Sequence, residues 1–138
     1  MNKGFTFLEV VLVVAITVAV TAAGVAGLSQ LQAVFKLRSA GDEIRSQLQY
    51  GRELAIANKD QLSYEISLVS GIVILRSNLG EIARFQSPAG ITYSPSSFNW
   101  GFTPLTGQLT GCVLSCQLTL TSTGNTELVI FQQNGIVN

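Results

Sequence analysis

The sequence predicts an α+β fold, in which a long N-terminal helix packs on a head built as an antiparallel β-sheet or β-sandwich. Residues 10–28 contain no charged residue and no proline, which is typical of a helix that spans a membrane. From residue 61 onward, short runs that alternate between apolar and polar side chains are separated by turn-forming residues, which is typical of hairpin-connected strands. A chain of 138 residues has room for one such head beside the helix.

The apolar segment begins directly after a carboxylate, Glu9. A carboxylate inside lipid is costly, so its presence needs an explanation. Three simpler interpretations of the segment remain open. A secretory signal peptide could be cleaved near Ala22, Ala23 or Ala26, although Glu9 within the apolar core argues against it. A plain membrane anchor leaves Glu9 without a partner, and a buried core helix of this length exceeds what such a chain would bury.

The helix is expected to continue to about residue 60 and to become amphipathic from residue 29. At 3.6 residues per turn, one stripe is apolar or small: Leu37, Gly41, Ile44, Leu48, Gly51 and Ala55, with Ala40, Tyr50 and Leu54 along one edge. The opposite side carries polar and charged residues: Lys36, Arg38, Asp42, Glu43, Arg45, Gln49, Arg52 and Glu53. We therefore predict that the stripe packs on a sheet, with close approach at Gly41 and Gly51.

Strands are predicted at residues 61–69, 72–76, 81–86, 91–93, 98–102, 108–114, 116–122 and 127–132. In the first of these, Leu62, Tyr64, Ile66 and Leu68 would share one face. Phe98, Trp100 and Phe102 would likewise share a face, which indicates sheet core, with an exposed aromatic contact surface as the alternative. Asn134-Gly135 is a turn signal, after which residues 136–137 could pair briefly.

The composition argues against an enzyme. Eight basic and eight acidic residues cancel, and there is no histidine, the commonest general base and metal ligand. Serine or threonine as a nucleophile would then need a lysine base, and Lys36 and Lys59 belong to the predicted helix. The carboxylates are scattered along the chain. We therefore predict no catalytic residue, no cofactor and no metal site.

The two cysteines, Cys112 and Cys116, lie in a segment that is expected to be exported. Lys3 is on the short side of the apolar segment, and the positive-inside tendency keeps that side cytoplasmic. An oxidising compartment then favours a disulfide between the cysteines. Free thiols and a zinc pair are the alternatives, although no histidine or second cysteine pair is present to complete a zinc site.

Residues 3–11 (Lys-Gly-Phe-Thr-Phe-Leu-Glu-Val-Val) resemble the class III signal peptide of type IV pilins and pseudopilins. The resemblance implies a leader of residues 1–4, cleaved between Gly4 and Phe5 by a prepilin peptidase, with N-methylation of Phe5. Glu9 would then be the fifth mature residue, where the family places a glutamate that meets the N-terminal amine of a neighbouring subunit. An ion pair of this kind would offset much of the cost of both charges in lipid.

The same resemblance implies a single-pass protein of the bacterial inner membrane with its head in the periplasm. An inner-membrane assembly platform would build it, with other pilins or pseudopilins, into a helical filament that can reach the cell surface. Residues 5–28 would be the transmembrane half of the helix, residues 29–60 the amphipathic half and residues 61–138 the globular head.

A second resemblance covers later residues. Residues 48–59, followed by a strand, resemble the helix end of the minor pseudopilins of type II secretion and of FimT-like minor pilins. Residues 87–91, Trp100-Gly101-Phe102 with Thr106-Gly107, and residues 133–137 fit the same pattern. The family implies a β-sandwich-like head and a structural role, as a minor pseudopilin or minor pilin of a type II secretion pseudopilus or a type IV pilus. A major pilin is a further possibility.

The alternative function is a FimT-like tip module that binds DNA or another ligand during DNA uptake. In that group a basic C-terminal stretch contacts DNA, but residues 132–138 contain no Lys or Arg. After Asp60, the basic residues are Arg76 and Arg84 alone. Because phosphate contacts supply most non-specific affinity, nucleic acid is not the expected partner.

Overall fold

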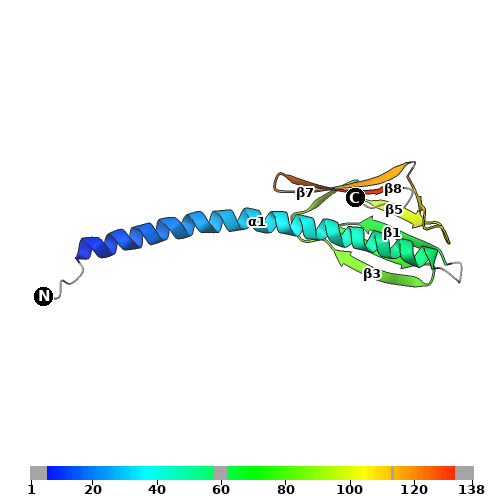
Figure 1. Cartoon of the computed structure of the whole chain (residues 1–138), viewed down its shortest axis with the longest axis horizontal. Coiled ribbons are helices and arrows are strands. Elements are labelled where there is room, and N and C mark those ends of the chain that lie inside the picture. The colour runs from blue at the N-terminus through cyan, green and yellow to red at the C-terminus, as the bar shows by residue number, and fades with distance from the viewer. Residues whose placement is uncertain (1–5, 58–61, 113, 133–138) are drawn as a thin grey trace. The chain divides into compact units, whose positions relative to one another are not determined.

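One helix followed by eight strands makes up the described part of the chain, residues 6–57, 62–112 and 114–132 of the computed structural model (Figure 1). Helix α1 is Phe7–Ile56. The strands are β1 (Tyr64–Val69), β2 (Ile72–Ser77), β3 (Gly80–Gln86), β4 (Thr92–Ser94), β5 (Phe98–Phe102), β6 (Leu109–Thr110), β7 (Ser115–Ser122) and β8 (Asn125–Gln132). This order confirms the predicted α+β class.

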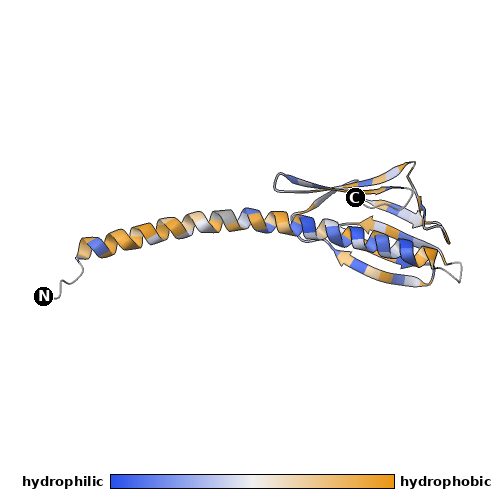
Figure 2. Ribbon diagram, in the orientation of Figure 1, coloured by the Kyte–Doolittle hydropathy of each residue, from blue (hydrophilic) through white to orange (hydrophobic). Residues whose placement is uncertain are grey.

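The chain divides into two compact units, Met1–Ala33 and Val34–Asn138. In the first unit, α1 is almost entirely apolar (Figure 2), and the large apolar side chains from Phe7 to Leu31 have exposed fractions of 50–86%. The second unit holds the rest of α1, where hydrophilic residues alternate with apolar ones, and all the described strands. It also contains every residue of the hydrophobic core cluster.

The strands form two antiparallel sheets. The five-stranded sheet has the order β3-β2-β1-β5-β6, and the three-stranded sheet has the order β4-β7-β8. In the larger sheet, Ile66 of β1 lies between Leu75 of β2 and Trp100 of β5. The next residue on the other face, Glu65, lies between Arg76 and Gly101. Because strand side chains alternate between faces, β1 presents apolar residues to the core and polar ones away from it.

The apolar stripe of α1 packs into the core as the periodicity predicts. Leu37, Ala40, Ile44, Leu48 and Ala55 are at most 2% exposed and belong to one cluster with the strand residues. The predicted close approach at glycine is confirmed at Gly51, where an added Cβ would lie 2.8 Å from Phe102 Cε2 and 2.9 Å from Leu75 Cδ1. A Cβ at Gly41 would lie 3.0 Å from the Cγ of Glu127.

The edge of the stripe differs from the prediction. Tyr50, expected to widen the buried stripe, is 46% exposed, whereas the polar Gln47 is only 5% exposed. Three residues correspond to about 300° of rotation, so Gln47 lies about 60° closer to the centre of the stripe than Tyr50 does. The position of each residue around the helix therefore determines its burial, although glutamine is the more polar of the two side chains.

The strand predicted at residues 108–114 is also too long. β6 contains only Leu109 and Thr110, because Gly111 adopts a left-handed backbone with φ of 105° that ends the strand. The aromatic residues of β5 agree with the core interpretation: Trp100 and Phe102 are 6% and 3% exposed. Phe98 is half-buried and stacks on Trp100 with ring centroids 3.9 Å apart. The turn predicted at Asn134-Gly135 and the pairing at residues 136–137 lie outside the described residues.

Candidate functional site

The first turn of α1 carries the predicted site residue Glu9. Thr6 precedes the helix, and the backbone N–H of Glu9 donates to the Thr6 hydroxyl oxygen at 3.3 Å and to the Thr6 carbonyl at 3.1 Å. A threonine followed three residues later by a glutamate is the sequence of a capping box. The positive end of the helix dipole also favours a carboxylate in this turn. The predicted cleavage residues Gly4 and Phe5 lie outside the described residues.

The polar groups of the apolar half of α1 are satisfied within the helix. The Thr17 hydroxyl donates to the Val13 carbonyl at 2.8 Å, and the Thr21 hydroxyl donates to the Thr17 carbonyl at 2.9 Å. Such bonds let a threonine face hydrocarbon without an unsatisfied polar group. By length and composition, α1 qualifies as a helix that can cross a membrane. Its exposed apolar side chains would be covered by lipid or by other apolar helices.

Glu9 is the one charged residue between Phe7 and Ala33. Among the described side chains, none forms an ion pair with it. Burial of an unpaired carboxylate costs several kcal/mol in order of magnitude. If the surface around Glu9 is covered by lipid or by another helix, either a proton or a cation from outside the described residues must neutralise it.

In the second unit, Arg45 ties α1 to β8. Its Nη2 lies 2.7 Å from Glu127 Oε1 and donates to the Leu128 carbonyl at 3.0 Å, while its Nη1 lies 3.0 Å from Asp42 Oδ1. The helical spacing of Asp42 and Arg45 predicts their contact. The contact with Glu127 was missed, because no local pattern joins residues that are 82 positions apart.

A loop from the sheet closes the C-terminal end of α1. The backbone N–H of Leu105 donates to the Ala55 carbonyl at 2.8 Å, which satisfies one of the acceptors left open where a helix ends. The loop lies close against the helix at Gly107, where a Cβ would lie 2.8 Å from both Arg52 Cγ and Ile56 Cγ1. Gly107 also has a φ of 63°, a left-handed conformation that favours glycine. Both the close contact with the helix and the backbone conformation therefore require a residue without a side chain.

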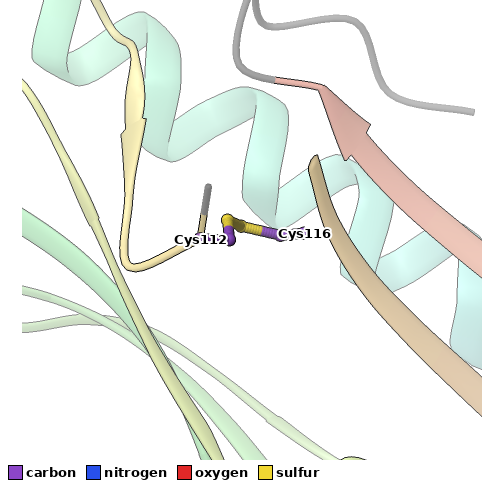
Figure 3. The surroundings of a disulfide bond; sticks show 2 residues. All are labelled: Cys112 and Cys116. Atoms are coloured by element: carbon purple, nitrogen blue, oxygen red, sulfur yellow. A yellow bond between two sulfur atoms is a disulfide. The ribbon is translucent and has the colours of Figure 1, made fainter. Parts of the chain in front are cut away.

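Cys112 and Cys116 are joined by a disulfide, which is the first of the three arrangements that the sequence allows (Figure 3). The bridge connects the segment after β6 to the beginning of β7, with the two Cα atoms 5.5 Å apart. Cys116 is 2% exposed and belongs to the core cluster, whereas Leu114 inside the closed loop is 79% exposed. The bridge thus anchors an exposed loop to the core.

The cations of the described strands do not gather into a basic surface. Arg84 of β3 forms two hydrogen bonds with the Glu81 carboxylate, at 3.0 and 3.1 Å. The hydrogen bond to Glu81, followed by the charge of Glu81, raises the pKa of Arg84 above its ordinary value. Arg76 of β2 lies beside Glu65 in the strand register. Each arginine therefore has an acidic neighbour, and the structure adds no support for DNA binding.

Comparisons with known proteins support the fold. No protein-family model and no curated protein sequence matches the chain. Among solved structures, the chain is similar to the type IV minor pilin FimU of Pseudomonas aeruginosa strain PAO1, with 15% sequence identity and a TM-score of 0.62. The similarity covers 78% of this chain and 90% of that one. The chain therefore has a type IV pilin-like fold.

Proposed function

We propose that the protein is a structural subunit, a minor pilin or minor pseudopilin, of a type IV pilus or a type II secretion pseudopilus. The observation that carries the proposal is a pilin-like fold combined with an exposed apolar helix that has one carboxylate, Glu9, in its first turn. This helix is suited first to lipid and then to the interior of a helical filament, since both surround it with apolar groups.

Processing would prepare the subunit for assembly. A prepilin peptidase cuts between Gly4 and Phe5 and methylates Phe5, so the new amine belongs to the residue four positions before Glu9 in the sequence. The precursor is held in the bacterial inner membrane with its head in the periplasm. An assembly platform then moves it into the filament. Glu9 pairs there with the amine of a neighbouring subunit, which supplies the missing cation.

The assembly test compares two substitutions at Glu9. Glu9→Gln keeps a side chain that suits the third position of a capping box but removes the charge, and Glu9→Ala removes both. We expect both variants to enter the membrane normally, and their incorporation into sheared filaments to fall at least about tenfold, as the loss of about 1.4 kcal/mol per contact requires. Normal incorporation of Glu9→Gln would remove the role given to the charge.

Thr6→Ala is the matched control. It removes the hydroxyl that caps the helix, at a cost of about 1 kcal/mol in helix stability, but leaves the Glu9 charge in place. Incorporation of Thr6→Ala should therefore stay close to that of the parent chain. If it falls as far as that of Glu9→Gln, helix capping explains both results and the ion pair is not needed.

The processing test is a mass measurement of the mature chain from its host. We expect it to begin with N-methylated Phe5. A mature chain that begins at Met1, or after Ala26, would contradict cleavage by a prepilin peptidase and would favour an uncleaved anchor or a secretory signal peptide.

A further inference from the structure

The exposed side of α1 changes from apolar to cationic at the start of the second unit. Lys36 is the first charged residue after Glu9, and Arg38 is the next. Both side chains are exposed, and Phe35 beside them is 65% exposed. Leu37, by contrast, is 2% exposed and belongs to the core cluster. Phe35, Lys36 and Arg38 are called the collar residues below.

Helix geometry brings the collar residues to one side of α1. At about 100° per residue, Lys36 lies about 100° to one side of Phe35, and Arg38 lies about 60° to the other. The buried Leu37 lies about 160° from Phe35, almost on the opposite side of the helix. The collar is therefore an aromatic ring with a cation on each side, on the face of α1 that is turned away from the core.

The two collar cations have no counter-charge in the described part of the chain. None of the ion pairs between described side chains includes Lys36 or Arg38. Residues 10–41 contain no aspartate or glutamate. The first acidic residue after them, Asp42, already lies 3.0 Å from Arg45 Nη1. The collar thus presents positive charge to whatever molecule lies beside it.

The length of the uncharged segment places the collar at a membrane surface. Residues 10–35 carry no charge, and at 1.5 Å per residue they correspond to about 39 Å of helix. A bilayer has a hydrocarbon core of about 30 Å and measures about 40–45 Å with its headgroups. When Glu9 is near one surface, the collar comes at the level of the lipid phosphates of the other. The inference rests on the membrane location in the proposed function, but not on filament assembly.

Membrane orientation does not account for the collar cations. In the proposed orientation this end of the segment is periplasmic, whereas the positive-inside tendency favours Lys and Arg on the cytoplasmic side. A binding role gives the cations a reason to be there. An exposed phenylalanine needs an apolar neighbour, and the two cations need an anionic one. An anionic phospholipid supplies both in one molecule.

We propose that the collar binds anionic phospholipid in the leaflet that faces the head. Lys36 and Arg38 contact lipid phosphate groups, and Phe35 packs on the acyl chains next to them. The attraction acts within a Debye length of about 8 Å, which suits cations at the headgroup level. A nucleic acid would satisfy the two cations but would leave the phenylalanine ring in water.

The test uses the full chain in vesicles of phosphatidylcholine and phosphatidylglycerol, with a tryptophan reporter in the collar. Phe35→Trp keeps an aromatic ring there, and the parent chain gives the background emission of Trp100, which is 6% exposed in the core. Bromine atoms near the top of the acyl chains, carried by one of the two lipids at a time, quench a ring that touches that lipid. We expect both lipids to quench the reporter, with an association constant at least about threefold higher for phosphatidylglycerol. About 1 M NaCl should abolish this preference, because it shortens the Debye length to about 3 Å.

Matched charge variants test whether the collar sets the preference. In the Phe35→Trp chain, Lys36→Gln combined with Arg38→Gln should bring the ratio of the two association constants to within about 1.5-fold of one. Arg76→Gln combined with Arg84→Gln removes the same number of charges from β2 and β3 and should leave the ratio unchanged. A ratio near one before any charge is removed, an equal fall in both double variants, or a reporter that neither lipid quenches would overturn the proposal.

Alkaline extraction of the same vesicles separates this result from the proposed function. A chain that stays with the vesicles at high pH has α1 in the bilayer, so a missing lipid preference in that chain rejects lipid binding by the collar alone. A chain that is released at high pH contradicts the membrane location on which both proposals rest.

Discussion

The guanidinium of Arg45 on α1 lies 2.7 Å from the carboxylate of Glu127 on β8, and both side chains are about three-quarters buried, with exposed fractions of 22% and 25%. Gly41 makes room for this pair, since a Cβ there would lie 3.0 Å from Glu127 Cγ and 3.2 Å from Arg45 Nη1. The pair joins the helix to the edge of the three-stranded sheet. Because the pair is partly buried, removal of one partner should reduce the stability of the fold more than the loss of an ion pair on the surface would.

We expect Glu127→Gln to lower the free energy of unfolding by about 1–2 kcal/mol, because Arg45, about three-quarters buried, then keeps only Asp42 as a counter-charge among the described side chains. The measurement is urea unfolding of residues 34–138, which include the whole core cluster. Glu81→Gln, which breaks the more exposed pair with Arg84, is the control and should have a smaller effect. Equal losses in the two variants would show that Glu127 has no special role.

Gly51→Ala should destabilise the same fragment by about 1–3 kcal/mol, although alanine is the better helix former. The new methyl group would lie within 2.9 Å of Phe102 and Leu75, both of which are buried. Gln49→Ala, at an exposed position of the same helix, should leave the unfolding midpoint nearly unchanged. A midpoint for Gly51→Ala at or above that of the parent would show that the helix can move away without cost.

The disulfide should make a local and modest contribution. Closing so short a loop corresponds to about 2 kcal/mol in the chain-entropy description. We expect the double variant Cys112→Ala, Cys116→Ala to unfold at lower urea concentration by an amount of that order. Alkylation of the native chain without reductant should add no label, because the two sulfurs are bonded to each other. Labelling of either cysteine, with no reductant present, would contradict the bond.

Tyr93 should make the free energy of unfolding of residues 34–138 depend on pH in the alkaline range. Burial raises the pKa of Tyr93 above its ordinary value, because burial disfavours the phenolate. Its contribution to stability is therefore complete below pH of about 10 and is lost as the pH rises through the pKa of the folded state. Tyr93→Phe should reduce this alkaline loss relative to the parent chain. The free energy of unfolding measured between pH 8 and pH 11 checks the difference.

The elements of the fold could be predicted because their signals are local. Turn residues separate the runs that become β1, β2 and β3, and the stripe from Leu37 to Ala55 has the period of a helix. The cap that the Thr6 hydroxyl provides to the Glu9 N–H was missed, although a threonine three residues before a glutamate is a local signal for it. Patterns of this kind need no knowledge of distant parts of the chain.

The arrangement of the sheets could not be predicted in the same way. β5 pairs with β1 although β2, β3 and β4 lie between them in the sequence, and no turn signal links those two strands. The same reason hid the contact of Glu127 with Arg45 and the hydrogen bond from Leu105 at the end of α1. Each depends on tertiary packing that brings together side chains far apart in the chain.

The strand order has a consequence for how such heads can meet one another. An open sheet edge offers free backbone groups to any passing strand, and proteins protect such edges with short strands, charges or covering elements. Here β6 has two residues and β4 has three, β3 carries the Arg84–Glu81 pair, and Arg45 occupies the Leu128 carbonyl on β8. If two such heads lie side by side, these edges favour contact through side chains over pairing into a continuous sheet.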